Sequence, residues 1–355
     1  MTQGPVSFQR DPVLLEAVRA CLAGLPAQAP VAVAVSGGAD SSMLAVHAAG
    51  VAQEQGRPLH LLHVHHGLQA GADDWAARVQ VLADLLQLPL ATVRVTVETG
   101  GGSGVEAAAR HARYAALSAL AAERNAGVVL LAHHRNDQAE TVLLRLLRGA
   151  GPSGMAAIPG ESEREGVRYL RPWLDMNRAT ILSAAQRWKD QTGWEPVADP
   201  SNHDPRYTRA AVRTMLAPVL DLRWPGWRDI LARHARQAAE AAGILEEVAR
   251  ADFDRLDPAP DGRSFALAPW RELAPPHQTL VLRHWLARNG SRMPTEARLA
   301  ELVRQLRQLH ALGHDRQMLF EHGPMRVRCV RGRVLLEARP AGRARAPVSP
   351  RLPGR

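Results

Sequence analysis

A short loop rich in glycine and hydroxyl side chains follows the first apolar run of the sequence, VAVAV at 31–35. Glycine lets a backbone approach a ligand closely, and serine hydroxyls donate hydrogen bonds to phosphate oxygens. A helix that begins in such a loop directs its free N–H groups into the same space. The sequence therefore predicts a phosphate or pyrophosphate site, formed by Ser36, Gly37, Gly38, Ala39, Asp40, Ser41 and Ser42.

Two familiar phosphate loops do not fit this string. A Walker loop needs GxxxxGK[ST] and the dinucleotide fingerprint needs GxGxxG, and SGGADSS has neither spacing. Asp40 beside a polyphosphate indicates a bridging Mg²⁺ ion, since two anionic groups otherwise repel each other. The alternative is an ordinary strand-to-helix turn with a serine cap, but such a turn seldom needs the whole string.

A second polar group follows a later apolar run, AGVVLLAHH at 126–134. Asp137 and Glu140 are three residues apart on a predicted helix, so both carboxylates lie on one face. Such a pair can hold an ammonium group and help to remove its proton, although a solvated helix N-terminus is the alternative interpretation. His133 can donate to a phosphate, or it can be a packed histidine at the end of a strand.

Arginines at helical spacings supply candidate anion contacts. Arg113 is the predicted phosphate or substrate contact on a helix through Glu123, whereas Arg110 is expected to form a surface ion pair. Arg209 and Arg213 are four residues apart and would present one basic face to RNA phosphate or to a substrate carboxylate. A glycine-containing loop that starts near Arg148 would form a mobile flap, or else an ordinary glycine C-cap. The flanking basic residues are Arg145 and Arg148.

Five histidines lie near the ends of two of the apolar runs, so a metal site must be considered. Alternate rings of HVHH on a strand point to opposite faces of the sheet, and no cysteine or HExxH spacing completes a zinc ligand set. We therefore expect His65 near a nucleotide, mainly through its backbone, and no zinc. The five histidines considered are His63, His65, His66, His133 and His134.

Strands and helices must alternate to position these groups. The predicted strands are 31–35, 58–67, 90–98 and 126–134, and the predicted helices are 41–55, 73–88, 103–123 and 136–149. This alternation predicts an α/β fold with a doubly wound, Rossmann-like parallel sheet. Ligands bind at the carboxyl ends of such strands, where SGGADSS, HVHHG and AHHRNDQAET all fall.

The last third of the chain has a different pattern. A long helix is expected over 227–256, then amphipathic helices over 278–288 and 295–309, and a strand meander over 317–338. Arg326 and Arg328 on the meander would contact an RNA backbone, or they lie on a solvated sheet face. We expect four parts: a catalytic domain 1–222, a helical connector 223–256, a smaller α+β RNA-recognition domain 257–339 and a disordered Pro/Arg tail 340–355.

Bulk composition narrows the class of protein. The 355-residue chain has a formal net charge of +9, which favours an anionic partner such as nucleic acid, although an arginine-biased surface would look similar. Its two cysteines, Cys21 and Cys329, argue against a disulfide framework and suit a reducing cytosol. We expect no signal peptide or membrane span and a cytoplasmic location, and we leave open whether the protein is a homodimer.

The string SGGADSS resembles the pyrophosphate loop (PP-loop) of the N-type ATP pyrophosphatases. Within this group of enzymes, the first 220 or so residues resemble the tRNA(Ile)-lysidine synthetase family. Five strings carry the resemblance: HVHHGLQ at 63–69, EAAARHARY at 106–114, LLAHHRNDQAETVLLRLLRGAGPSGM at 130–155, RPWL at 171–174 and ADPSNHDPRYTRAAVR at 198–213. The resemblance implies that ATP and Mg²⁺ activate carbon two of the wobble cytidine in a tRNA(Ile) with a CAU anticodon. Free L-lysine then displaces AMP to give lysidine.

The resemblance also implies roles for individual residues. Loop 36–42 and His65 would bind ATP, with Asp40 at Mg²⁺. The catalytic or lysine-binding positions would be Asp137, Glu140, His133, Arg113 and Arg209, and the tRNA-binding positions Arg145, Arg148, Arg213, Arg326 and Arg328. Asn136, Gln69 and Ala210 depart from the family pattern. Two alternatives remain: another adenylating tRNA-modifying enzyme such as a thiolase, which would normally need a cysteine pair or iron–sulfur ligands, and a non-catalytic tRNA-binding protein.

Overall fold

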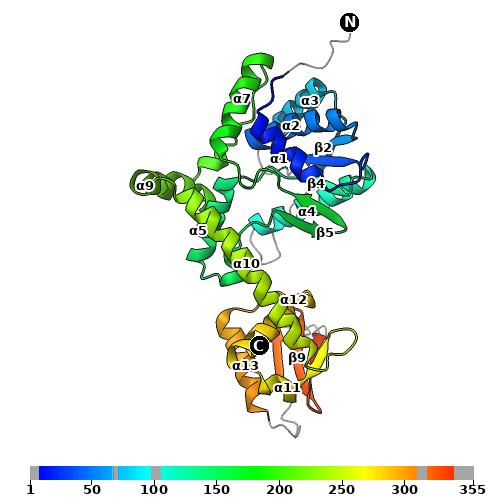
Figure 1. The fold of residues 1–355 in the computed structure, drawn as a ribbon, viewed down its shortest axis with the longest axis vertical. Helices are drawn as coiled ribbons and strands as arrows, with labels where there is room; N and C mark the ends of the chain where they lie inside the picture. Colours follow the sequence, from blue (N-terminus) through cyan, green and yellow to red (C-terminus); the bar gives the residue numbers. More distant parts are fainter. Residues whose placement is uncertain (1–7, 66, 68–70, 97–104, 310–317, 340–355) are drawn as a thin grey trace, which may run out of the picture. The chain divides into compact units, whose positions relative to one another are not determined.

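The computed structural model describes residues 8–65, 67, 71–96, 105–309 and 318–339. The chain forms two compact units, Met1–Ala239 and Glu240–Arg355, and the boundary falls within one helix, α10 (Trp227–Asp254) (Figure 1). That helix matches the one predicted over 227–256. None of the described helices is both long and apolar enough to span a membrane. The division into four parts stays a prediction, and the expected tail lies outside the described residues.

A six-stranded sheet forms the centre of the first unit, in the order β3-β2-β1-β4-β6-β5. The strands are β1 (Val31–Ala34), β2 (Leu59–His65), β3 (Leu90–Arg94), β4 (Val128–Leu130), β5 (Glu161–Arg164) and β6 (Val167–Leu170). All neighbouring strands are parallel except β5 and β6, which form an antiparallel hairpin at the edge. The predicted parallel sheet is confirmed, but the β5–β6 hairpin was not predicted.

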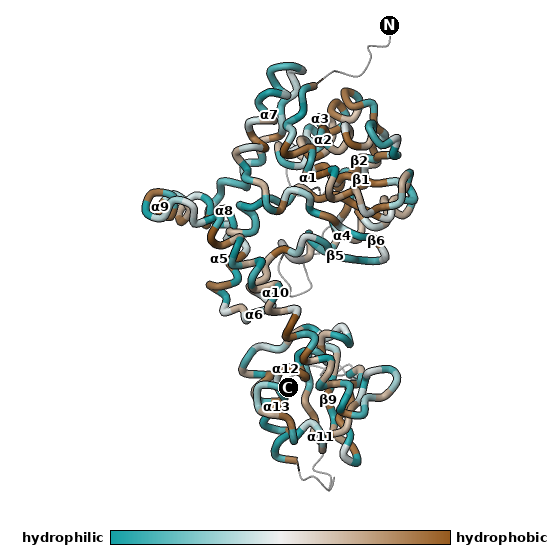
Figure 2. The backbone as a smooth tube through the Cα atoms, in the orientation of Figure 1, coloured by the Kyte–Doolittle hydropathy of each residue, from teal (hydrophilic) through white to brown (hydrophobic). Residues whose placement is uncertain are grey.

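The central strand β1 shows why the sheet is buried on both faces. Val31 and Val33 pack on one face with three helices, α1 (Pro12–Leu22), α2 (Ala39–Gln55) and α7 (Arg178–Thr192). Ala32 packs on the other face with α4 (Val105–Glu123). All three side chains are fully buried, and the tube in Figure 2 is hydrophobic along β1. Such continuous burial is expected of a strand inside a parallel sheet with helices on both sides.

The predicted helices are found within a few residues of their expected bounds. They are α2 (Ala39–Gln55), α3 (Ala72–Leu86), α4 (Val105–Glu123) and α5 (Arg135–Leu147). Gly56 ends α2 in the left-handed conformation, at φ 61°. The expected helix start at Ser103 lies outside the described residues. The other helical segments described before α10 are α1 (Pro12–Leu22), α6 (Pro152–Met155), α7 (Arg178–Thr192), a 3₁₀ helix (Pro200–His203), α8 (Thr208–Ala211), a π-helical turn (Val212–Leu216) and α9 (Ala217–Arg223).

The second unit is a small α+β domain, as predicted. Its four-stranded antiparallel sheet has the order β7-β10-β9-β8, with β7 (Ser264–Ala266), β8 (Leu319–His322), β9 (Met325–Val330) and β10 (Arg333–Ala338). The helices are α11 (Leu267–Glu272), α12 (Pro275–Arg288) and α13 (Glu296–Gln308). Phe265, Trp270 and Trp285 are fully buried in its core. The sequence predicted the meander and two of these helices but not β7 or α11.

Candidate active site

The glycine-serine loop is organised by its own hydroxyl groups. Ser41 Oγ accepts a hydrogen bond from Ser36 N at 3.1 Å, lies 3.0 Å from Ser36 Oγ, and donates to the carbonyl of Gly38 at 3.2 Å. Gly37 has φ +91°, a conformation that favours glycine. The loop then enters α2 directly, with Gly38 as the N-cap and Ala39 as the first helical residue.

A cavity of about 500 Å³ opens at the carboxyl ends of β1, β2 and β4. Ser36, Gly38, Asp40 and Ser41 contribute to its wall, whereas Gly37, Ala39 and the fully buried Ser42 do not. The predicted His65, Arg113 and His133 also line it, together with Trp75, Val197, Asp199 and Asn202. The structure therefore brings the three predicted clusters to one cavity, at the edge of the sheet where parallel folds bind ligands.

His134 connects the loop to the acidic pair. Its Nε2 lies 3.6 Å from Asp40 Oδ1, and its Nδ1 accepts a hydrogen bond from Asp137 N at 3.3 Å. Asp137 Oδ2 in turn accepts from the backbone N of His134 at 3.1 Å, which completes a capping box at the start of α5. Because Nδ1 accepts, a neutral ring carries its proton on Nε2, facing Asp40.

Arg178 on α7 holds the other side of the Asp40 carboxylate. Its Nε and Nη2 each donate to one oxygen of Asp40 at 3.3 Å. Burial alone would raise the pKa of Asp40, but His134 and Arg178 outweigh it, so this pKa lies below its ordinary value. Asp40 is therefore ionised at neutral pH. Arg178 was not predicted from the sequence, because it lies 138 positions after Asp40 and no local pattern links the two residues.

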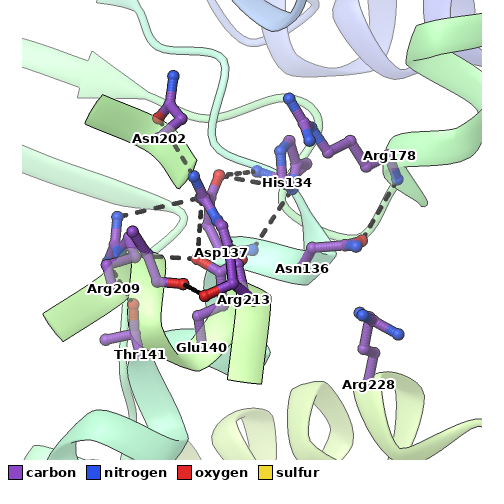
Figure 3. Close-up of polar contacts among 12 residues, drawn as sticks. His134, Asn136, Asp137, Glu140, Thr141, Arg178, Asn202, Arg209, Arg213 and Arg228 are labelled. Carbon is purple, nitrogen blue, oxygen red and sulfur yellow. Dashed lines mark hydrogen bonds and ion pairs between the residues drawn. The ribbon is translucent and has the colours of Figure 1, made fainter. Parts of the chain in front are cut away.

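The acidic pair is buried and ion-paired (Figure 3). Arg213 donates from Nε and Nη2 to the two oxygens of Glu140, at 2.7 and 2.9 Å, and from Nη2 to Asp137 Oδ1 at 3.2 Å. Arg209 lies 3.6 Å from Glu140 and donates to Thr141 Oγ1 at 3.0 Å. Arg209 and Arg213 thus share one face, as predicted, but that face is directed at the acidic pair. The role of Arg213 in tRNA binding stays a prediction.

His133 and Arg113 form part of the cavity wall without carboxylate partners among the described side chains. Burial lowers the pKa of His133 to about 3. Asp137 raises this pKa and nearby arginines lower it, and the ring is neutral at neutral pH. Its buried Nδ1 has no hydrogen-bond partner within the described part of the chain. Burial also lowers the pKa of Arg113. His65 is buried, with Nε2 3.1 Å from Asp73, and its carbonyl accepts from Val95 N at 2.9 Å.

The arginines predicted to bind tRNA differ in their surroundings. Arg145 donates to the carbonyl of Gly154, and Arg148 is exposed at the end of α5. In the second unit, Arg326 Nη2 lies 2.7 Å from Glu337 Oε2, and Arg328 lies 3.7 Å from the same oxygen. A carboxylate therefore partly neutralises the basic sheet face expected there.

Comparison with known proteins agrees with this geometry. Residues 15–220 match the PP-loop domain family, and residues 265–335 match the TilS substrate binding domain. The chain is 64% identical to the tRNA(Ile)-lysidine synthase of Bordetella bronchiseptica, over 88% of this chain and 90% of that one. It is 47% identical to that of Ralstonia nicotianae, over 78% of this chain and 58% of that one.

A solved structure shares the fold of the first unit. The U34-tRNA thiolase NcsA from Methanococcus maripaludis, solved with its [4Fe-4S] cluster, superposes with a TM-score of 0.53 at 16% identity, covering 64% of this chain and 78% of that one. This likeness concerns the fold alone. The matches in sequence carry the assignment: the chain belongs to the tRNA(Ile)-lysidine synthase family.

Proposed function

We propose that this protein is a ligase that joins free L-lysine to carbon two of the wobble cytidine in a tRNA(Ile) with a CAU anticodon, with ATP converted to AMP and pyrophosphate. One observation carries the proposal. Through His134, the loop that lines the cavity lies next to the buried carboxylate pair of α5. A nucleotide and an amino group can therefore meet at one centre, next to the cavity wall to which Arg113 contributes a positive charge.

In the first step, ATP would bind with its pyrophosphate against the loop. The amide groups at the start of α2 and the hydroxyls of Ser36 and Ser41 suit phosphate oxygens. Asp40 fits a Mg²⁺ ion, because it is ionised and lines the same cavity as Ser36 and Ser41, and oxygen atoms are the ligands that Mg²⁺ prefers. When bound, Mg²⁺ would neutralise charge on the phosphates as the cytidine attacks the α-phosphate.

In the second step, lysine would displace AMP. Asp137 and Glu140 form a buried carboxylate pair on α5, and this pair would hold the ε-amino group of lysine and take its proton. Arg213 donates to both oxygens of Glu140 and to Asp137 Oδ1, so the ammonium of lysine would replace some of these contacts. The neutral ring of His133 can donate or accept one hydrogen bond at the cavity wall without adding charge, and Arg113 would bind a phosphate group of the substrate at the same wall.

The tRNA would contact both units, at Arg145, Arg148 and Arg213 in the first, and at Arg326 and Arg328 in the second. The match of residues 265–335 to a substrate-binding domain supports this assignment for the second unit. A cytoplasmic location follows from the proposed substrate. The homodimer stays a prediction.

Neither alternative function has a specific observation in its favour. A [4Fe–4S] cluster needs three or four thiolates, and this chain has two cysteines, one in each unit. The departures at Asn136 and Ala210 leave Asp137 and Glu140 in place: Asn136 Oδ1 accepts from Arg178 N at 3.4 Å, and Ala210 is buried. A catalytic role is therefore preferred to a purely RNA-binding one.

The experiment combines purified protein, ATP, Mg²⁺, radiolabelled lysine and a tRNA(Ile) transcript. We expect ATP-dependent entry of label into the RNA, and loss of this activity in Asp40→Ala and Glu140→Gln. Label transfer without ATP, or equal transfer to a methionine tRNA with the same anticodon, would count against the proposal.

A further inference from the structure

Four arginines surround the buried ring of Tyr114 on α4. The guanidinium carbons of Arg110, Arg113 and Arg164 lie 5.3, 5.6 and 4.6 Å from the ring centroid. Arg110 and Arg171 each place Nη2 3.5 Å from the tyrosine hydroxyl. These residues come from α4, from β5 and from the segment after β6, so the fold assembles the group from separate parts of the sequence. We call it the Tyr114 arginine cluster.

The cluster carries positive charge that the described side chains do not neutralise. None of its four arginines is in an ion pair with a described carboxylate, whereas Arg168 on the same hairpin donates to Glu161 at 2.6 Å. The surface ion pair expected for Arg110 is therefore not found among the described residues. Burial lowers the pKa of Arg113 and of Arg145, and the charge of Arg110 lowers both further. The positive field thus extends from α4 toward α5.

The cluster also leads from the cavity to the surface. Arg113 lines the cavity wall, while Arg110 and Arg164 are exposed. Cation–π contact with the buried Tyr114 ring holds the guanidinium groups in place. Because the ring is only 3% exposed, it supports the arginines and is not a platform on which a base could stack. A group of uncompensated cations of this kind binds an anion with more than one charge.

We propose that Arg110, Arg113 and Arg164 bind consecutive backbone phosphates of the RNA strand that delivers its target base to the cavity. The inference rests on the proposed function for its substrate class. RNA is favoured because the cluster connects the cavity where the base would react, which Arg113 lines, with the exposed Arg110 and Arg164, which a strand in solvent can reach. Arg113 contacts the phosphate nearest the reacting nucleotide, and Arg110 and Arg164 contact those outside.

The test measures binding of a fluorescent anticodon stem–loop RNA of CAU sequence to the full-length protein at several salt concentrations. The double variant Arg110→Gln, Arg164→Gln should bind about tenfold more weakly, and the slope of log K against log salt should shrink by roughly 1 to 2. Arg168→Gln is the matched control: it lies on the same hairpin, and Glu161 already pairs with it. It should bind RNA as the unmodified protein does, and ATP affinity should be equal in all three proteins.

Three results would overturn the proposal. The first is an unchanged RNA affinity and salt slope in the double variant, and the second is an equal loss of RNA affinity in Arg168→Gln. The third is a loss of ATP affinity in the double variant with RNA binding intact, which would assign the cluster to the nucleotide. The proposed function fails separately. If the unmodified protein incorporates no lysine but the double variant still loses RNA affinity, the docking site stands and the chemistry is wrong. If the unmodified protein incorporates lysine and the double variant keeps its RNA affinity, the chemistry stands and the docking site is wrong.

Discussion

Arg213 forms two parallel hydrogen bonds with Glu140, from Nε to Oε1 at 2.7 Å and from Nη2 to Oε2 at 2.9 Å. A guanidinium group thus occupies one edge of the carboxylate pair that is proposed to receive the ammonium of lysine. This bidentate geometry is the strongest form of an arginine–carboxylate contact. It holds the Glu140 carboxylate in a fixed position before any substrate arrives.

Replacing Arg213 by glutamine should destabilise the first unit. The change leaves Glu140, whose side chain is 7% exposed, with Arg209 as its nearest cation. The free energy of unfolding should fall by roughly 2 kcal/mol, less than for a fully buried pair, because 26% of Arg213 remains exposed. Urea denaturation measures this loss. Arg206→Gln is the control, since its pair with Asp204 is exposed, and a similar loss in both variants would contradict the account.

Gly37 should not tolerate a side chain. A Cβ atom there would lie 3.1 Å from Val197 Cγ2 and 3.3 Å from Val79 Cγ2, at a φ of +91°. Gly37→Ala should therefore lower the free energy of unfolding by about 1–2 kcal/mol and weaken ATP binding, because the loop must shift. Gly127→Ala, where a Cβ meets open space, should stay within about 0.5 kcal/mol of the parent. Equal stability of the two variants would be evidence against the loop geometry.

His47 should make the protein less stable in acid. Its Nε2 accepts from Asp11 N at 3.1 Å, and its Nδ1 lies 2.7 Å from the carbonyl of Met43, so the buried ring must be neutral. Burial lowers its pKa to about 4 from 6.5. Below pH 6.5 the unfolded chain takes up this proton and the folded chain does not, so stability falls as the pH drops toward 4.

The measurement compares the unmodified protein with His47→Gln in urea at pH 7 and pH 4. The unmodified protein should lose about 3 kcal/mol more than the variant over this interval. Other groups titrate in both proteins and cancel in the comparison. Parallel stability curves for the two proteins would show that His47 is protonated in the folded state.

Cys21 should react slowly with alkylating agents. Burial raises the pKa of its thiol to about 11, and Glu161 adds to this effect. In a Cys329→Ala background, iodoacetamide should modify native Cys21 at pH 8 about 100-fold more slowly than the same chain in urea, because the thiolate is the reactive form. Equal rates would reveal an accessible thiolate, which a sulfur-transfer function needs and the proposed ligase does not.

The fold and the location of the site followed from local signals, but the contacts within the site did not. The buried run at 31–35 and the glycines after it were enough to predict β1, the loop and α2. The β5–β6 hairpin was missed because three of the four residues of Glu161–Arg164 are charged and mostly exposed, and its partner strand Val167–Leu170 is only four residues long. The spacing of Arg209 and Arg213 predicted a shared face, but only the tertiary fold decides that this face meets Glu140, about 70 residues earlier.

The central claim is that one centre first adenylates the RNA and then uses the acidic pair to admit lysine. It is tested most directly by incubating the protein with α-³²P-labelled ATP and tRNA(Ile) in the absence of lysine, and then adding lysine. We predict that label accumulates on the tRNA, that lysine chases it to AMP, and that Asp137→Asn forms the labelled RNA but chases it at least 100-fold more slowly. Label that appears on lysine without tRNA, or a chase of equal rate in Asp137→Asn, would contradict the account.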